Sequence, residues 1–132
     1  MKAGLTDWLD DYGRAWRDRD ADAAAELFSE DAVYQWGPFG RRLRGRPLIR
    51  AAWAEATETQ ANVEFGYEVL SASQDGGLVR WWSAYDVPER ERHVRNEGIF
   101  RLMFDDDGLC QSLEEWWNSD EAPLDGTSPP SV

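Results

Sequence analysis

The N-terminal part of the chain carries apolar residues at helical spacing. One side of a helix would hold Leu5, Trp8, Leu9, Tyr12 and Trp16. The other side carries the charged residues Asp10, Asp11, Arg14 and Arg17. Thr6 and Asp7 are residue types that cap helix N-termini, so the pattern predicts an amphipathic helix from there to about Arg19.

Three further elements and a loop are predicted before residue 60. They are a short helix at 21–28, a strand at 30–36, a loop at 37–47 and a helix at 47–59. Asp20 or Asp22 can cap the short helix. Pro47 suits the first turn of the longer one, because its missing N–H is not needed there. Glycines stand at the ends of two predicted turns in the loop.

From residue 62 onward apolar and polar residues alternate, which is typical of β-strands. The predicted strands are 62–73, 78–87, 93–104 and 109–118. Helices followed by an antiparallel meander predict an α+β fold, in which one curved antiparallel sheet wraps around three N-terminal helices. The Pro-, Ser- and Gly-rich tail at 119–132 is expected to be disordered, outside a domain of residues 1–118.

The alternation also predicts which sheet face meets the helices, because residues two apart share a face. One face carries charged residues that could pair across strands, among them Glu64, Glu68, Arg80, Arg101 and Glu114. The other face is more apolar and is expected to point inward. On the charged face we also expect an apolar patch of Trp82, Ala84, Ile99, Met103 and Trp116. Such a patch favours a homodimer formed through the outer face.

Composition narrows the choice of partners. The chain has 132 residues and a formal net charge of −12, so nucleic acid and anionic membrane surfaces are not expected to bind. Cys110 is the single cysteine, which excludes an internal disulfide and a Cys-based zinc site. No run approaches the roughly 20 apolar residues of a membrane span, and the N-terminus does not read as a secretory signal. We expect a cytoplasmic protein without a metal or cofactor.

Aromatic residues make up 13% of the chain, including eight tryptophans, more than a small core usually needs. This excess suggests the wall of an internal cavity that takes a small apolar, ring-containing ligand. The expected wall consists of Trp16, Trp36, Phe39, Trp53, Phe65, Tyr67, Trp81, Tyr85, Phe100, Leu102, Leu113 and Trp117.

Three stretches together resemble a known family. "YGRAWRDRDADAAAELFSEDAVYQW", "GRPLIRAAW" and "FRLMFDDDGLCQSLEEWW" are similar, in this order, to motifs of the SnoaL-like branch of the nuclear transport factor 2-like superfamily. The resemblance covers about residues 6–118. It implies a cone of one curved sheet and three helices around a deep apolar pocket. Members include ketosteroid isomerase, polyketide cyclases, dehydratases, epoxide hydrolases and non-enzymatic binding modules, so the fold does not fix the function.

The resemblance to ketosteroid isomerase can be tested residue by residue. Its oxyanion-donating tyrosine falls on Tyr12, whereas its two catalytic carboxyl groups fall on Trp36 and Phe100. Neither aromatic ring can accept a proton from carbon. A standard ketosteroid isomerase mechanism is therefore excluded. A single histidine, His93, likewise cannot supply the histidine pair that the dehydratases use.

Glu115 is the best remaining candidate for acid–base chemistry, because alternation places it inward between Leu113 and Trp117. Burial would raise the pKa of its carboxyl. Tyr12 and Asn96 could then bind a ligand oxygen. The other interpretation is a solvated or ion-paired Glu115, a core tyrosine and a strand irregularity at Asn96.

Three hypotheses for the function stay open. The first is a binding protein for a ring-containing ligand. The second is an enzyme that isomerises, cyclises or dehydrates such a compound, with Glu115 moving a proton. The third is a filled cone that acts only through its dimer face.

Overall fold

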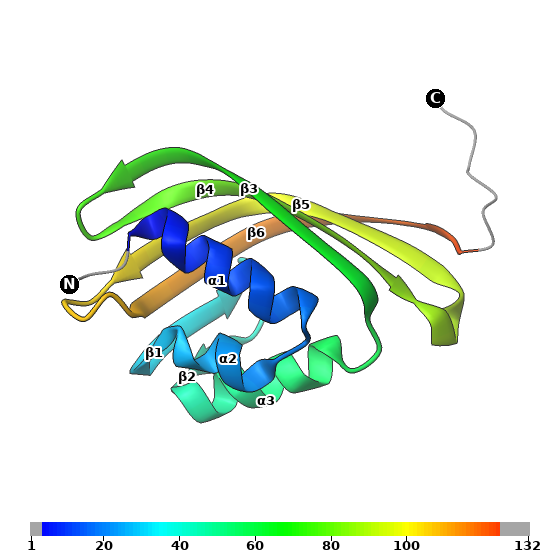
Figure 1. Cartoon of the computed structure of the whole chain (residues 1–132), viewed down its shortest axis with the longest axis horizontal. Coiled ribbons are helices and arrows are strands. Elements are labelled where there is room, and N and C mark those ends of the chain that lie inside the picture. Colours follow the sequence, from blue (N-terminus) through cyan, green and yellow to red (C-terminus); the bar gives the residue numbers. More distant parts are fainter. Residues whose placement is uncertain (1–3, 125–132) are drawn as a thin grey trace.

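The computed structural model describes residues 4–124, which form three α-helices and one six-stranded sheet (Figure 1). The helices are α1 (Leu5–Arg17), α2 (Ala21–Glu26) and α3 (Arg46–Thr57). The strands are β1 (Phe28–Trp36), β2 (Arg42–Arg44), β3 (Ala61–Ser73), β4 (Gly76–Val87), β5 (Arg92–Phe104) and β6 (Cys110–Pro123). None of these helices combines the length and apolar character needed to cross a membrane.

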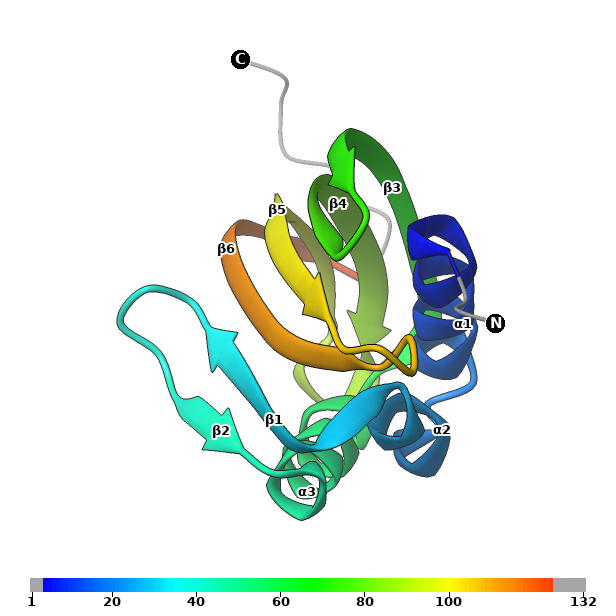
Figure 2. The same cartoon turned by 90° about the vertical axis from the view of Figure 1, so that its left-hand side faces the viewer.

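The strands are ordered β2-β1-β6-β5-β4-β3, and the sheet curves around the helices (Figures 1 and 2). The predicted α+β cone is confirmed, with one correction. β1 pairs in parallel with β6, whereas every other neighbouring pair is antiparallel, so the sheet is mixed. The parallel pair arises because the meander β3–β6 starts at the far edge and returns its last strand beside β1.

The inner face of the sheet forms the core with α1. Val79, Phe100 and Leu113 have no exposed surface, as the alternation predicts. α1 can approach the sheet closely at Gly13, where a Cβ atom would lie 2.8 Å from the Phe65 ring. This contact places the aromatic side of α1 directly over the sheet.

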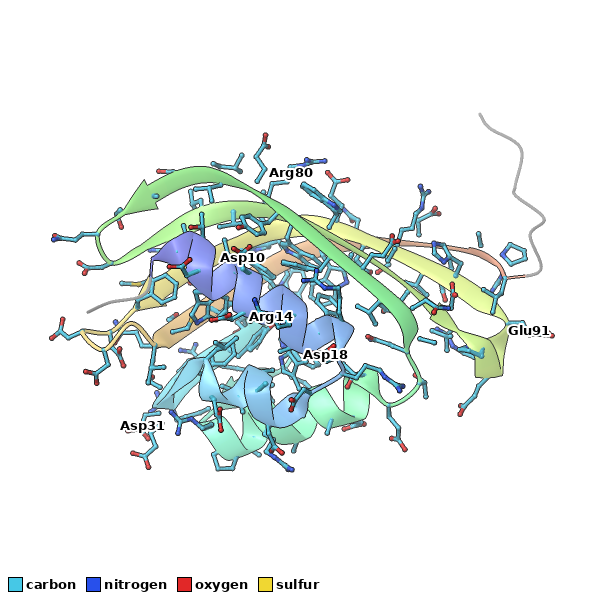
Figure 3. All side chains as sticks on the ribbon, viewed as in Figure 1. Asp10, Arg14, Asp18, Asp31, Arg80 and Glu91 are labelled. Atoms are coloured by element: carbon cyan, nitrogen blue, oxygen red, sulfur yellow. The ribbon has the colours of Figure 1, made fainter. Side chains whose placement is uncertain are left out.

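The outer face carries cross-strand ion pairs, one of them between two residues predicted for this face, Arg101 and Glu114. Arg80 contacts Glu97 at 2.6 Å, and Arg101 contacts Glu114 at 3.7 Å. Figure 3 shows Arg80 pointing away from the helices. Both pairs are exposed enough to add little stability, so their effect is to keep this face polar around its apolar residues.

The last strand is longer than predicted. β6 continues beyond residue 118 and pairs with β5 as far as Arg92 and Pro123. The predicted end of the last strand at residue 118 is therefore wrong. Backbone hydrogen bonds between β5 and β6 continue past Trp117, because such pairing does not require alternating apolar side chains. The rest of the expected tail, residues 125–132, lies outside the described residues.

Candidate functional site

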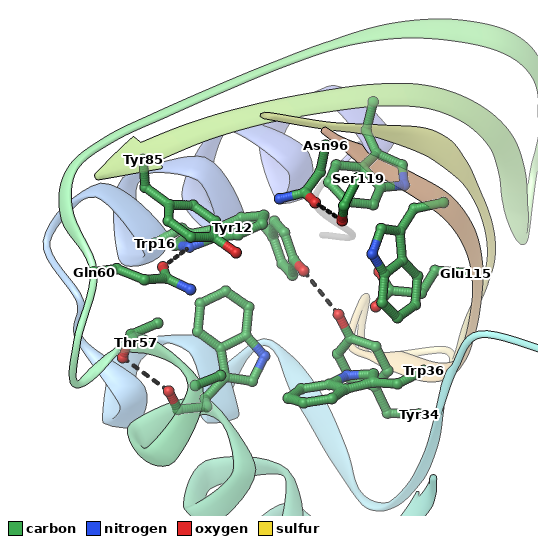
Figure 4. A pocket seen from close by; sticks show the side chains of 14 residues that line it. Tyr12, Trp16, Tyr34, Trp36, Thr57, Gln60, Tyr85, Asn96, Glu115 and Ser119 are labelled. Carbon is green, nitrogen blue, oxygen red and sulfur yellow. Dashed lines mark hydrogen bonds between the residues drawn. The ribbon is translucent and has the colours of Figure 1, made fainter. Parts of the chain in front are cut away.

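A cavity of about 320 Å³ lies between the inner sheet face and helices α1 and α3 (Figure 4). Its lining is largely aromatic, with a few polar side chains. The lining residues are Tyr12, Trp16, Tyr34, Trp36, Trp53, Ala56, Thr57, Gln60, Trp81, Tyr85, Asn96, Glu115, Trp117 and Ser119. A mainly aromatic cavity of this size with few polar groups is typical of a site for a small organic ligand.

One polar cluster inside the cavity joins α1, β1 and β6. The Tyr12 and Tyr34 hydroxyls are 2.8 Å apart, and either oxygen can be the donor. The Tyr34 hydroxyl also lies near enough to the Glu115 carboxyl to lower its pKa. All three side chains are buried, and Glu115 is 8% exposed. Helix and strands thus place two phenols and a carboxyl together in apolar surroundings.

Burial decides the charge of this cluster. Desolvation raises the pKa of Glu115 from 4.5 to about 8, and the nearby Tyr34 hydroxyl opposes this only in part. At neutral pH the carboxyl is therefore mostly protonated, and its O–H can donate. Burial, and then the nearby Glu115 carboxylate, raise the pKa of both tyrosines well above the ordinary value.

Asn96 and Trp16 line the same cavity, but both already have protein partners. Asn96 Nδ2 donates to Ser83 Oγ at 3.2 Å, and Ser119 Oγ donates to Asn96 Oδ1. Trp16 Nε1 donates to Gln60 Oε1 at 2.8 Å. These bonds hold Asn96 in place and leave it less free to bind a ligand than the sequence suggests.

A family model described as "SnoaL-like domain" matches residues 9–112. The chain belongs to the SnoaL-like domain family. The matched segment runs from α1 into β6 and includes most of the cavity's walls. A search of curated protein sequences finds no significant match.

Solved structures share the SnoaL-like fold at low sequence identity. RV0760c from Mycobacterium tuberculosis has a TM-score of 0.79 and 15% identity, and the alignment covers 92% of this chain and 98% of that one. A Catenulispora acidiphila protein with a ketosteroid isomerase-like fold, in complex with trimethylamine, has a TM-score of 0.73, 16% identity and 83% coverage of both chains. A proposed isomerase from Bacillus subtilis has a TM-score of 0.73 and 17% identity, covering 86% and 85%.

Most of the site residues predicted for this SnoaL-like domain do meet in the cavity. The lining includes Tyr12, Asn96, Glu115, Trp16, Trp36, Trp53, Trp81, Tyr85 and Trp117. Phe65, Phe100, Leu102 and Leu113 instead pack within the core beside the cavity. Tyr67 lies at the contact of α1 and β3, where its hydroxyl donates to Asp10 Oδ1 at 2.8 Å.

Phe39 is the clear error among the predicted wall residues. It lies in the turn between β1 and β2 and is fully exposed, at 101%. Its apolar type suggested an inward position. The turn closed by Gly40 N–H and the Gly37 carbonyl at 3.3 Å carries it away from the domain instead.

Five lining residues were missed: Tyr34, Ala56, Thr57, Gln60 and Ser119. Tyr34 could have been found, because it shares its strand face with Trp36 in the predicted strand at 30–36. Gln60 follows α3 and Ser119 lies in the unpredicted end of β6, so neither had a periodic signal.

Within residues 4–124, the remaining ionisable side chains give no second chemical site of comparable form. His93 Nδ1 lies 2.7 Å from Asp86 Oδ1, outside the set that lines the cavity. Among residues 4–124, no group of three or more His, Cys, Asp or Glu side chains is placed to hold a metal ion.

Proposed function

We propose that this SnoaL-like domain binds a small, neutral, ring-containing molecule, with a ligand oxygen at the Tyr12–Tyr34–Glu115 cluster. The observation that carries the proposal is the burial of Glu115, because it keeps a hydrogen-bond donor in an aromatic cavity. A protonated carboxyl beside a phenol can stabilise an oxygen on which negative charge develops.

Strand register explains how such a donor site arises without a carboxylate at position 100. Phe100 on β5 lies directly opposite Glu115 on β6. Opposite residues of a ladder project to the same face. Glu115 therefore brings a carboxyl next to the position where a standard ketosteroid isomerase carries one, while Trp36 leaves the proton-abstracting position without a base.

For turnover, this arrangement favours acid chemistry at an oxygen over proton abstraction at carbon. In an acid-assisted isomerisation, cyclisation or dehydration, Glu115 would give its proton to the ligand oxygen and recover one as the product forms. The alternative is ligand binding without turnover, as in a non-catalytic binding or dimeric interaction module, and both share the same binding site.

Glu115 variants test the binding mode. We expect Glu115→Ala to weaken binding of 1-tetralone, a bicyclic ketone, by about two- to tenfold, because one neutral hydrogen bond is lost. Glu115→Gln keeps a donor N–H and should stay within about threefold of the wild type. Calorimetric titration measures both constants. Glu114→Gln, which changes the neighbouring outward residue, is the matched control.

Several outcomes would count against this function. If the wild type and Glu115→Ala bind 1-tetralone with equal affinity, the Tyr12–Tyr34–Glu115 cluster is not part of the binding site. Tighter binding of trimethylammonium than of any neutral ring compound would point to cation–π recognition by the aromatic walls, as a complex of the Catenulispora relative with trimethylamine suggests. Mass spectrometry of ligands extracted from the purified protein would identify the physiological compound. With that compound, loss of turnover in Glu115→Gln without loss of binding supports catalysis.

We also propose that the outer sheet face pairs with a second copy of the chain. Trp82, Met103 and Trp116 are 39%, 42% and 39% exposed there. Arg80 lies 4.9 Å from the centre of the Trp82 ring and pairs with Glu97. A two-fold axis can place the arginines of one copy against the glutamates of the other. The outer faces of two copies can therefore pair, despite the net charge of −12 on each chain.

Sedimentation of a charged variant tests this partner. Trp116→Glu should shift the protein from dimer to monomer at micromolar concentration, because the carboxylate would be desolvated at the contact. Leu48→Glu is the control, since Leu48 is 54% exposed on α3, away from the outer face. A monomeric wild type, or a Trp116→Glu dimer of undiminished stability, would contradict the proposal.

A further inference from the structure

The β1–β2 hairpin and the start of α3 carry an island of positive charge on an acidic protein. From residue 37 to residue 54 the chain has no acidic residue, and its arginines there are Arg41, Arg42, Arg44, Arg46 and Arg50. Arg50 pairs with Asp22, and Arg46 donates to the Phe28 carbonyl oxygen at 2.7 Å. Among the residues that the structure describes, the other three arginines have no ion-pair partner and no side-chain hydrogen bond. Their charge is therefore free to meet a partner.

Two of these three arginines lie on β2, which is an edge strand. In the order β2-β1-β6-β5-β4-β3, β2 has β1 on one side and, within the described part of the chain, no strand on the other. Figure 2 shows the β1–β2 hairpin at one side of the domain, with its turn projecting away from the other elements. An edge strand presents backbone N–H and C=O groups with which a further strand can pair.

Arg42 and Arg44 present these backbone groups to the open edge. In an antiparallel pair, residues that exchange backbone hydrogen bonds with the neighbouring strand alternate with residues whose N–H and C=O point away from it. The bonds that flank β2 fix this alternation, because the Arg41 carbonyl accepts from β1 at 3.0 Å and the Gly45 N–H donates to β1 at 2.8 Å. Leu43, midway between them, therefore also faces β1. The N–H and C=O groups of Arg42 and Arg44 point the other way.

The side chains of the same two arginines share the outer face of the sheet. Leu43 lies between them and is 3% exposed, because alternate residues of a strand point to opposite faces. On β1, Arg42 lies opposite Gln35 and Arg44 lies opposite Val33, so neither arginine has an acidic residue directly across from it. Charged side chains on an edge strand deter unwanted pairing. Arginines, however, deter apolar and basic strands only, and they attract a strand that carries carboxylates.

We propose that the β2 edge binds an extended, acidic segment of another protein, which joins the sheet as an antiparallel strand. Antiparallel pairing is slightly more stable per residue than parallel pairing. Two carboxylates spaced two residues apart in the segment would lie opposite Arg42 and Arg44 on the outer face. The same two residues of the segment would exchange backbone hydrogen bonds with the edge, which is the usual mode of strand addition. Of the described residues that line the cavity, none belongs to β2, so the proposal is independent of the ligand.

A short peptide tests the proposal with the full chain. Fluorescein-labelled Gly-Val-Glu-Val-Glu-Val-Gly carries glutamates at the required spacing, and fluorescence anisotropy measures its binding. We expect a dissociation constant on the order of 10–100 µM in 0.15 M salt, which screens the rest of the acidic surface beyond about 8 Å. The matched peptide with lysines in place of the glutamates should bind at least about tenfold more weakly, because its charges meet the arginines with the same sign.

N-methylated peptides test the backbone pairing separately from the charge. N-methylation of both glutamates removes the N–H groups that would face β2, and should weaken binding by at least about fivefold, the effect of two hydrogen bonds. N-methylation of two valines is the control. Their N–H groups point away from β2 in the proposed register, so binding should stay within about twofold of the parent peptide.

Variants of Arg42 make the same distinction on the protein. Arg42→Gln removes the charge and should weaken binding of the glutamate peptide by about two- to fivefold. Arg42→Pro also removes the outward N–H, and should weaken binding by a further two- to tenfold or about that. Proline is tolerated on an edge strand where its nitrogen faces outward, and circular dichroism checks that the variant is folded. Arg50→Gln is the matched control and should stay within about twofold of the wild type, because Arg50 belongs to the same basic island but is paired with Asp22.

Four results would overturn the proposal. If the glutamate peptide does not bind, or binds no better than the lysine peptide, the arginines do not select an acidic strand. If N-methylation of the glutamates has no effect, the arginines bind anions without strand addition. If Arg42→Pro and Arg42→Gln bind the peptide equally, the open edge takes no part. If sedimentation shows that Arg42→Pro lowers the oligomeric state of the free protein, a second copy of the chain occupies the edge instead.

Discussion

Glu115→Gln is expected to stabilise the protein strongly at pH 8 and hardly at all at pH 4. The cause is the cost of burying a carboxyl that must ionise. The pKa of Glu115 is about 8 in the folded protein and near its ordinary value of 4.5 in the unfolded chain. Between these values the unfolded chain has released the proton and the folded protein has kept it.

The sign of the effect follows from proton linkage. Where the folded state binds more protons, the free energy of unfolding falls as pH rises, by about 1.4 kcal/mol per pH unit for one group. The stabilisation from neutral Glu115 is fully present below pH 4.5 and is lost between pH 4.5 and 8. The accumulated difference is on the order of 4 kcal/mol. Glutamine does not titrate, so the variant avoids this loss.

Urea denaturation of the wild type and Glu115→Gln, from pH 4 to 8.5, measures the difference directly. Repulsion among the other acidic residues changes both proteins alike and cancels. Glu114→Gln controls for the removal of one negative charge, because Glu114 lies on the outer face beside Arg101. If the free energies of unfolding of the wild type and Glu115→Gln change with pH in parallel, the Glu115 carboxyl is solvated. It would then be ionised at neutral pH, and the proposed donor site would be wrong.

Much of the site could be predicted because strand alternation is a strong local signal. It placed Glu115, Trp81 and Trp117 on one face, and the structure brings all three to the cavity. The environment of Glu115 could not be predicted in the same way. Its Tyr34 partner comes from β1, and the parallel pairing of β1 with β6 depends on how the whole sheet closes.

The wrong predictions concern segments whose positions are set by backbone geometry and strand pairing, and not by the pattern of their side chains. β2 has three residues in an arginine-rich loop, too few for a visible alternation. Residues 119–123 continue β6 although they are mostly polar, because the neighbouring strand β5 supplies their ladder partners. The position of Phe39 depends on the turn from Gly37 to Gly40 and not on its own apolar character. In each case the interaction that sets the position of the segment leaves no trace in the local alternation of apolar and polar residues.

Alanine variants of Phe100 and Phe39 are expected to differ measurably in their free energy of unfolding. Both were expected in the cavity wall, yet Phe100 has no exposed surface and Phe39 is fully exposed. The Phe100 ring stacks on Trp81, with centroids 4.9 Å apart, and meets Tyr12 edge-on at 5.5 Å. Removing it takes away buried area and leaves a cavity behind the wall of the pocket.

We expect Phe100→Ala to lower the free energy of unfolding by about 3–5 kcal/mol, and Phe39→Ala to change it by less than about 0.5 kcal/mol. Urea denaturation at pH 5, where Glu115 is protonated in the folded protein, gives both values. Phe100→Leu, which keeps most of the volume, should fall between them and provides a folded variant if Phe100→Ala does not fold. Because Phe100 supports Trp81, Phe100→Leu should also weaken ligand binding, whereas Phe39→Ala should not. Comparable losses of stability in Phe39→Ala and Phe100→Ala would mean that the turn folds back onto the domain, and Phe39 would then return to the wall of the site.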